Sequence, residues 1–171
     1  ELGEHASADM TGLVGQYVHG NEPSHHILYM YPYVGEQWKT AEKVRFVMND
    51  FYTDKTDGII GNEDCGQMSS WYIMSALGFY QVNPSLGVYV FGSPYLDKAT
   101  IRLKDNKTFT VEAKNNSKEN IYIQSVELNG QPYAKSYILH EDIMKGGKLT
   151  FVMGKEPNKN FGSAKENRPK S

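Results

Sequence analysis

The residues best suited to chemistry lie in one short loop that holds an amide and two adjacent carboxylates, Asn62, Glu63 and Asp64. Gly61 and Gly66 enclose them, and glycine lets a backbone turn tightly and approach a ligand closely. Carboxylates are common general acids and bases. Glu63 and Asp64 are therefore the candidate catalytic residues of the chain.

The segment after this loop predicts an α-helix over residues 68–77, with apolar or aromatic residues at 68, 71, 72, 74 and 76. The free N–H groups and the dipole of a helix N-terminus favour anions, so the acidic loop would sit in a favourable field. A purely structural alternative is a capping box, with Asp64 as N-cap, Gln67 at the third helical position and Glu63 in solvent. Both interpretations fit these residues.

A second polar cluster lies upstream and contains His19, Asn21, Glu22, His25 and His26. Adjacent residues on a helix point about 100° apart, so His25 and His26 are poorly placed to share one zinc ion. An oxygen-ligated cation such as calcium, bound by Glu22 and by the amide or carbonyls of Asn21, fits better, although the spacing of an EF-hand is absent. The structural alternative is that Asn21 caps a helix and the histidines bond to buried backbone groups.

Length and composition limit the possible classes of function. A chain of 171 residues forms one large domain or two small ones, and a net charge of −2 argues against a nucleic-acid partner. No apolar run reaches membrane-spanning length, and residues 1–4 do not resemble a signal peptide. Cys65 is the only cysteine, which excludes an internal disulfide and a cysteine-based zinc site. The 12 Tyr, 7 Phe and 2 Trp fit either carbohydrate recognition or a well-packed core.

Helical periodicity occupies the first half of the chain, and a boundary is expected at Asn83 and Pro84. We expect helices over 23–33, over 40–52 with Thr40 as N-cap, and over 68–77 with Gly78 as C-cap. The aromatic residues expected to remain partly uncovered on these helices are Tyr29, Tyr31, Trp71 and Tyr72.

From residue 87 onwards the apolar period changes to two, which predicts five or six antiparallel strands between residues 87 and 153. A slip in phase between Ile123 and Val126 indicates a β-bulge, and Asn129-Gly130 is a strong hairpin signal. The predicted fold is α+β, with a helical segment over 1–84, an antiparallel β region over 85–161 and a loosely held polar tail over 162–171.

Residues 15–26 and 61–72 resemble two signature stretches of glycoside hydrolase family 92, calcium-dependent exo-acting α-mannosidases that are abundant in gut Bacteroidetes. Further similarity lies in residues 38–40, 75–80, 83–84, 92–94 and 109–128, in the same order along the chain. Members of this family are several times longer, with an N-terminal β-sandwich and an (α/α)6 barrel. The resemblance therefore implies a C-terminal fragment that contains the last barrel helices and the strands after them.

The resemblance also implies a reaction, the inverting hydrolysis of terminal α-linked mannose from glycans. Asp64 resembles the general base, with Glu63 as its rival. Asn21 and Glu22 resemble contributors to a calcium and mannose site, where calcium contacts the 2- and 3-hydroxyls of the sugar. The residues implied to contact the sugar, or to support those that do, are His19, His25 and Gln67, together with Asn21.

The general acid of the family lies upstream of the matched region, and residues 1–10 contain no equivalent. The resemblance thus implies an incomplete calcium site, an inactive fragment, the missing N-terminal part of the same enzyme as partner, and a secreted, periplasmic or outer-surface location. The alternative function is a non-catalytic carbohydrate-binding or structural β-module. In that case Glu63 and Asp64 would only cap a helix.

Overall fold

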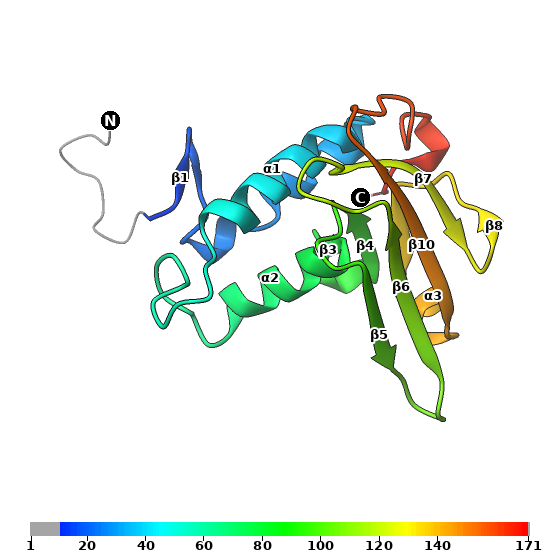
Figure 1. The fold of residues 1–171 in the computed structure, drawn as a ribbon, viewed down its shortest axis with the longest axis horizontal. Helices are drawn as coiled ribbons and strands as arrows, with labels where there is room; N and C mark the ends of the chain where they lie inside the picture. The colour runs from blue at the N-terminus through cyan, green and yellow to red at the C-terminus, as the bar shows by residue number, and fades with distance from the viewer. Residues whose placement is uncertain (1–10, 171) are drawn as a thin grey trace.

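The computed structural model describes residues 11–170, in which a helical layer packs against two small sheets (Figure 1). The layer contains α1 (Gln37–Asp50) and α2 (Gln67–Leu77), and the hairpin of β1 (Leu13–Val14) and β2 (Tyr17–Val18) lies beyond its far end. No helix within residues 11–170 has the length and apolar character needed to cross a membrane. The predicted α+β class is confirmed.

Besides the β1–β2 hairpin, the described strands form two sheets. The larger sheet has the order β5 (Lys98–Arg102), β6 (Thr108–Lys114), β10 (Gly147–Gly154), β7 (Tyr122–Leu128), β8 (Gln131–Pro132). The smaller has the order β3 (Phe79–Gln81), β4 (Val88–Phe91), β9 (Tyr137–Leu139), and is followed by the short helix α3 (His140–Met144). One pair, β10 with β6, runs parallel, so the expectation of a wholly antiparallel region is wrong there.

Local signals in the β region are confirmed. The β7–β10 register shifts between Val152 and Met153, which leaves Gln124 of β7 as the extra residue of a bulge. Asn129 and Gly130 have φ values of 53° and 77° and connect β7 to β8. Positive φ at both central residues is typical of the tight hairpin turn that Asn-Gly predicts.

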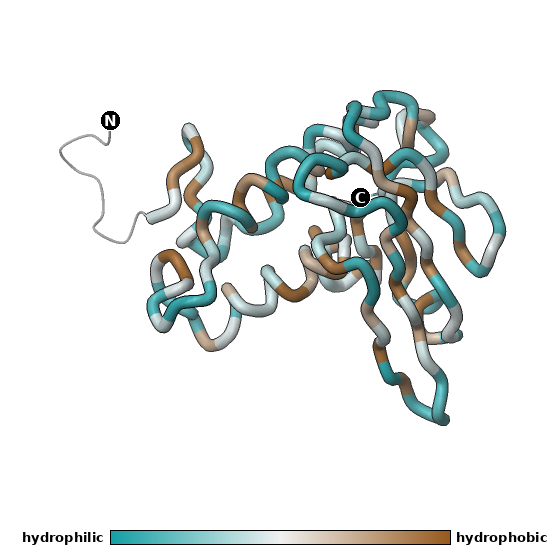
Figure 2. Tube along the Cα trace, in the orientation of Figure 1, coloured by the Kyte–Doolittle hydropathy of each residue, from teal (hydrophilic) through white to brown (hydrophobic). Residues whose placement is uncertain are grey.

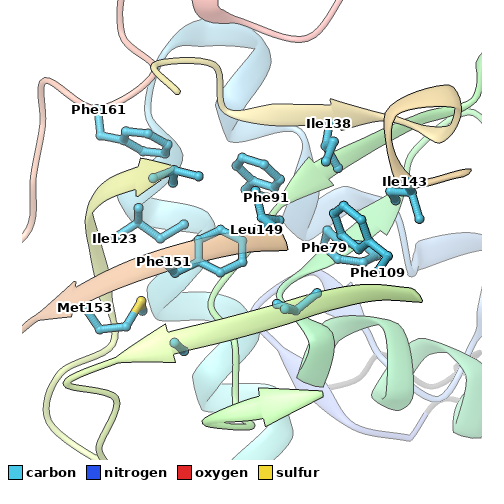
Figure 3. Close-up of a cluster of buried hydrophobic side chains, with 13 residues drawn as sticks. Phe79, Phe91, Phe109, Ile123, Ile138, Ile143, Leu149, Phe151, Met153 and Phe161 are labelled. Carbon is cyan, nitrogen blue, oxygen red and sulfur yellow. The ribbon is translucent and has the colours of Figure 1, made fainter. Parts of the chain in front are cut away.

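The main core lies between the two sheets, as Figure 3 shows. The rings of Phe91 and Phe151 meet edge to face at 5.1 Å, one from each sheet. Figure 2 shows apolar positions, in brown, along the strands that contribute to this core. Its buried members are Phe79, Phe91, Phe109, Val111, Ala113, Ile123, Val126, Ile138, Ile143, Leu149, Phe151, Met153 and Phe161.

A second core joins the helices to the smaller sheet through Val90 of β4. Tyr29 and Trp71 lie in it with no exposed surface, so the expectation that they remain uncovered is wrong. Side chains of α1, α2 and β4 cover them within this chain. Tyr31 and Tyr72 are half-buried.

The predicted helix over 23–33 is wrong, because the chain instead forms the 3₁₀ turns η1 (Glu22–Ser24), η2 (Ile27–Tyr29) and η3 (Tyr31–Val34). Pro32 cannot donate to the carbonyl of Leu28 and would clash with it in an α-helix. That carbonyl accepts the hydroxyl of Thr40 at 2.7 Å. Thr40 is therefore a buried residue inside α1, and the predicted N-cap is also wrong.

Arg45 of α1 connects the helical layer to the region after the expected boundary at residue 84. Its guanidinium donates to Ser93 Oγ at 3.0 Å, to the carbonyl of Pro94 and to Asn116 Oδ1, and it lies 4.9 Å from the ring of Tyr95. Burial lowers its pKa to about 10. The expected domain boundary at residue 84 remains a prediction. The segments on its two sides are joined by the buried contacts of Arg45.

The polar tail is held more firmly than predicted. The carbonyl of Asn167, in the turn η5 (Lys165–Asn167), accepts the backbone N–H of Ser136 at 2.8 Å and its hydroxyl at 3.1 Å. Arg168 donates to the carbonyl of Ser163, and Pro169 is buried. Over residues 162–170 the expectation of a loosely held tail is therefore wrong.

Candidate active site

The acidic loop enters α2 through three successive residues with left-handed backbone. The φ values are 50° at Asp64, 56° at Cys65 and 92° at Gly66. Backbone bonds from Gln67 N–H to the Asp64 carbonyl and from Met68 N–H to the Glu63 carbonyl, both 3.2 Å, close this turn. Left-handed non-glycine residues cost about 1 kcal/mol or more each and often occur at functional sites. The loop is thus a specifically stabilised structure.

Glu63, and not Asp64, caps the first turn of α2. Its Oε1 accepts the backbone N–H of Ser69 at 3.1 Å, and its Oε2 accepts the Ser69 hydroxyl at 2.9 Å. The N-cap position belongs to Gly66, so the predicted capping box of Asp64 and Gln67 is wrong. Asp64 is exposed to solvent.

His19 is fully buried and both of its ring nitrogens are bonded. The Tyr17 hydroxyl lies 2.7 Å from Nδ1, and the Tyr52 hydroxyl lies 2.7 Å from Nε2. Tyr52 donates its own hydrogen to the carbonyl of Met68 at 3.2 Å. It therefore accepts from His19 Nε2–H, while Nδ1 accepts from Tyr17. Burial, with a contribution from His25, lowers the pKa of His19 to about 3.

His25 connects the upstream cluster to α2. Its Nε2 lies 3.0 Å from the His19 carbonyl, and its Nδ1 accepts from the side-chain amide of Gln67 at 3.1 Å. Burial lowers the pKa of His25, and the His19 carbonyl and the charges of Glu22 and Asp64 oppose this shift. Glu22 and Asp64 thus both lie within electrostatic range of this imidazole.

The predicted site residues thus divide by their access to a ligand. Asn21, Glu22 and Asp64 are exposed, and Gln67 is half-buried. His19 and His25 are buried, and all four of their ring nitrogens are hydrogen-bonded inside the protein. This geometry favours a role in holding other site residues in place over direct contact with a sugar.

Several tyrosines and one tryptophan surround the buried histidines and Gln67, and the sequence analysis assigned them no role. Tyr80 accepts the Gln67 amide at 3.2 Å, and Trp71 Nε1 donates to the His25 carbonyl at 3.2 Å. Tyr17 and Tyr52 flank His19. The one available signal was the position of Tyr17, two residues from His19 and on the same face of a strand.

Within residues 11–170, no three His, Cys, Asp or Glu side chains come close enough to hold a metal ion together. Asn21 and Glu22 lie next to each other at the start of η1 and offer oxygen donors to solvent. Calcium takes about six to eight oxygen ligands, so these residues fit a partial set of ligands for it.

The two buried histidines predict how stability depends on pH. Their pKa values are below the ordinary value of 6.5, so the unfolded chain binds more protons than the folded chain as pH falls below that value. We expect the free energy of unfolding to be fully retained above pH 6.5 and to fall between pH 6.5 and about 3. Urea denaturation of the chain and of His19→Gln at several pH values checks this, because the variant should show a shallower fall. Equal slopes would contradict the assignment.

The comparisons with known proteins agree with this geometry. The model of the glycosyl hydrolase family 92 catalytic domain matches residues 1–155. A protein of Arthroderma benhamiae described as an uncharacterized secreted glycosidase is 34% identical over 155 residues, which is 89% of this chain and 20% of that protein. A family 92 α-mannosidase of Bacteroides thetaiotaomicron in complex with mannoimidazole superposes with a TM-score of 0.92 at 42% identity, over 95% of this chain and 21% of that one.

A second solved structure, a family 92 inverting mannosidase of the same bacterium, has a TM-score of 0.86 at 41% identity and covers 92% of this chain and 21% of its own. The chain thus spans about a fifth of the length of these relatives. The match runs through both the helical layer and the strands, including the acidic loop. The chain belongs to glycoside hydrolase family 92.

Proposed function

We propose that this chain is the C-terminal part of an α-mannosidase that removes terminal α-linked mannose from glycans with inversion, and that Asp64 is its general base. The observation that carries the proposal is the exposed Asp64, held in a left-handed turn three residues before Gln67, whose side-chain amide bonds to His25. Hydrolysis of an aryl α-mannoside by the intact enzyme and by its Asp64→Asn variant tests it. The variant should lose most of kcat.

The hydrogen bonds of Glu63 argue against Glu63 as the base. A general base must hold a water molecule by a hydrogen bond and then take its proton. Both carboxylate oxygens of Glu63 already accept from Ser69. Asp64 is an exposed residue, which a solvent water can reach. In the proposed step the water oxygen attacks the anomeric carbon, its proton goes to Asp64, and the glycosidic bond breaks on the opposite face. An upstream acid protonates the leaving oxygen.

Asn21, Glu22 and Gln67 are the proposed sugar-binding residues. Their amides and carboxylate provide both donors and acceptors, which the hydroxyls of a mannose need. The His25 imidazole fixes the Gln67 amide, and Tyr80 provides that amide with a second acceptor. Calcium, when bound through Asn21 and Glu22, would contact sugar hydroxyls and favour distortion of the ring towards an oxocarbenium-like state.

The incomplete set of oxygen ligands gives a direct prediction for calcium. Titration calorimetry of this chain alone should show weak binding or none, because Glu22 and Asn21 supply only part of the coordination. Glu22→Gln should remove any weak signal. Micromolar or tighter affinity would mean that the chain completes the calcium site by itself.

Exposed apolar side chains on the helical layer support a missing partner, which we propose to be the upstream part of the same enzyme. Ile27, Met30, Val34, Phe46 and Ile73 are each at least 41% exposed. Patches of this kind often mark surfaces that other protein covers. The chain alone should therefore not hydrolyse an aryl α-mannoside, and turnover by it would require a general acid among its own residues.

We also propose that the enzyme acts outside the cytoplasm, as a secreted, periplasmic or outer-surface protein. The description of the fungal relative as secreted supports this location. The alternative of a non-catalytic β-module has less support, because the family match covers the helical layer as well as the strands.

A further inference from the structure

The two segments that carry the candidate site are joined by a closed ring of hydrogen bonds, here called the His19 ring. His19 Nε2 bonds to the Tyr52 hydroxyl at 2.7 Å, and Tyr52 bonds to the Met68 carbonyl at 3.2 Å. The neighbouring residue, Gln67, bonds to His25 Nδ1 at 3.1 Å, and His25 Nε2 returns to the His19 carbonyl at 3.0 Å. The ring thus connects residues 19–25 to the first turn of α2 twice.

The donors and acceptors of the His19 ring are consistent with one another. His19 donates to Tyr52, which donates to Met68, and Gln67 donates to His25, which donates to the His19 carbonyl. Every donor is used in one direction, and both imidazoles are neutral with the hydrogen on Nε2. Because only one arrangement of donors and acceptors satisfies every hydrogen bond of the ring, the ring specifies one relative position of its residues.

Aromatic packing holds the ring rigidly. The indole of Trp71 lies at 69° to the imidazole of His19, with ring centroids 4.4 Å apart. It also stacks on the phenol ring of Tyr52, with centroids 5.9 Å apart and an interplanar angle of 9°. Trp71 has no exposed surface, and its Nε1 donates to the carbonyl of His25. Movement of either segment would have to break several of these hydrogen bonds, of which the bond from His25 to the His19 carbonyl is buried.

We infer that Tyr52 and His19 are positioning residues for hydrolysis, which set the placement of Glu22 and Gln67 relative to Asp64. This inference rests on the proposed function of Asp64. Glu22 lies three residues from His25, and Asp64 lies three residues before Gln67, so the ring links the supports of both carboxylates. Neither Tyr52 nor His19 needs to touch the sugar for this role, and His19 is fully buried.

Tyr17 provides a matched control. Its hydroxyl also lies 2.7 Å from His19, but at Nδ1, outside the ring. Tyr17 is buried and Tyr52 is half-buried, and burial raises the pKa of each hydroxyl. Tyr17→Phe and Tyr52→Phe each remove one hydroxyl that bonds to the imidazole of His19. Only Tyr52→Phe breaks the His19 ring of hydrogen bonds.

The experiment measures kcat, KM and thermal stability of the intact enzyme and these two variants with an aryl α-mannoside. Tyr52→Phe should lower kcat about tenfold with KM changed less than about threefold, because a misplaced base affects the transition state more than binding. Tyr17→Phe should keep kcat within about twofold, with a similar fall in melting temperature. If both variants lose kcat equally, or Tyr52→Phe keeps it, the inference is wrong.

A second pair of variants covers the case in which Tyr52→Phe does not fold. His19→Gln keeps an amide donor for Tyr52 and should retain at least about a third of kcat, whereas His19→Leu keeps no donor and should lose about tenfold. Equal activity of the two would overturn the inference. Asp64→Asn, assayed in parallel, separates the failures: a normal rate in that variant would sink the proposed function, and a loss confined to that variant would sink only the positioning role.

Discussion

Asp64→Asn in the intact enzyme should lower kcat by a factor of about 10² to 10⁴, the usual contribution of a general base. Asparagine keeps the shape of the side chain but cannot take a proton from water. The loop backbone should persist, because the bonds that close it run from Gln67 and Met68 to main-chain carbonyls. KM for an aryl α-mannoside should change much less than kcat, since binding does not need the basicity.

Glu63→Gln is the companion variant that separates the two adjacent carboxylates. The new amide oxygen can still accept the Ser69 N–H, so we expect a cap-sized loss of about 1 kcal/mol in stability and a small change in kcat. Asp57→Asn, in an exposed turn, controls for the loss of one negative charge. A larger kcat loss in Glu63→Gln than in Asp64→Asn would make Glu63 the base.

Trp71→Ala should destabilise the chain by about 3–5 kcal/mol, the usual cost of removing a large buried aromatic residue. Trp71 lies fully buried between α1, α2 and the 3₁₀ turns, and its removal leaves a cavity beside His19 and Tyr52. Urea denaturation of the chain measures the change.

Two further variants help to explain the loss of stability in Trp71→Ala. Trp71→Phe keeps most of the packing and removes the bond to the His25 carbonyl, so it should cost less than Trp71→Ala. Phe46→Ala removes an aromatic ring that is 44% exposed and should cost well under half as much as Trp71→Ala. Equal costs for Phe46→Ala and Trp71→Ala would contradict the central place of Trp71.

Periodic segments were the part of the fold that the sequence predicted well. The helix expected over 68–77 is α2, Gln67–Leu77, and Gly78 is its C-cap with φ of 98°. The alternation of Phe109, Val111 and Ala113 is the buried face of β6. These features depend on neighbours in the sequence, which is why a local pattern reveals them.

Features that depend on distant contacts escaped prediction. The parallel pairing of β10 with β6 depends on where the chain returns to the larger sheet after β9 and α3, and no local pattern records it. The loss of the helix over 23–33 follows from Pro32 together with Thr40, which takes the freed carbonyl of Leu28. The sequence shows Pro32, which could have been given more weight, but it does not show that Thr40 bonds to the carbonyl of Leu28.

Within the candidate site, the sequence identified the loop, but the capping alternative gave the cap to Asp64, whereas Glu63 bonds to the first turn of α2. The N-cap of α2 is Gly66, so Asp64, two residues earlier in the chain, does not occupy that position. Glu63 lies far enough back for its longer side chain to reach Ser69. The supporting ring of His19, Tyr52 and His25 comes from three separate segments and needed the structure.

Azide rescue of an Asp64→Ala variant of the intact enzyme tests the role of Asp64 as general base most directly. Azide is a nucleophile that needs no deprotonation, and it can enter the space left by the carboxylate. In an inverting mechanism it attacks the face opposite the leaving group, so azide should raise the rate and yield the β-mannosyl azide from an α-mannoside. A folded variant that azide does not accelerate, or that yields the α-mannosyl azide, would contradict Asp64 as the base of an inverting mannosidase.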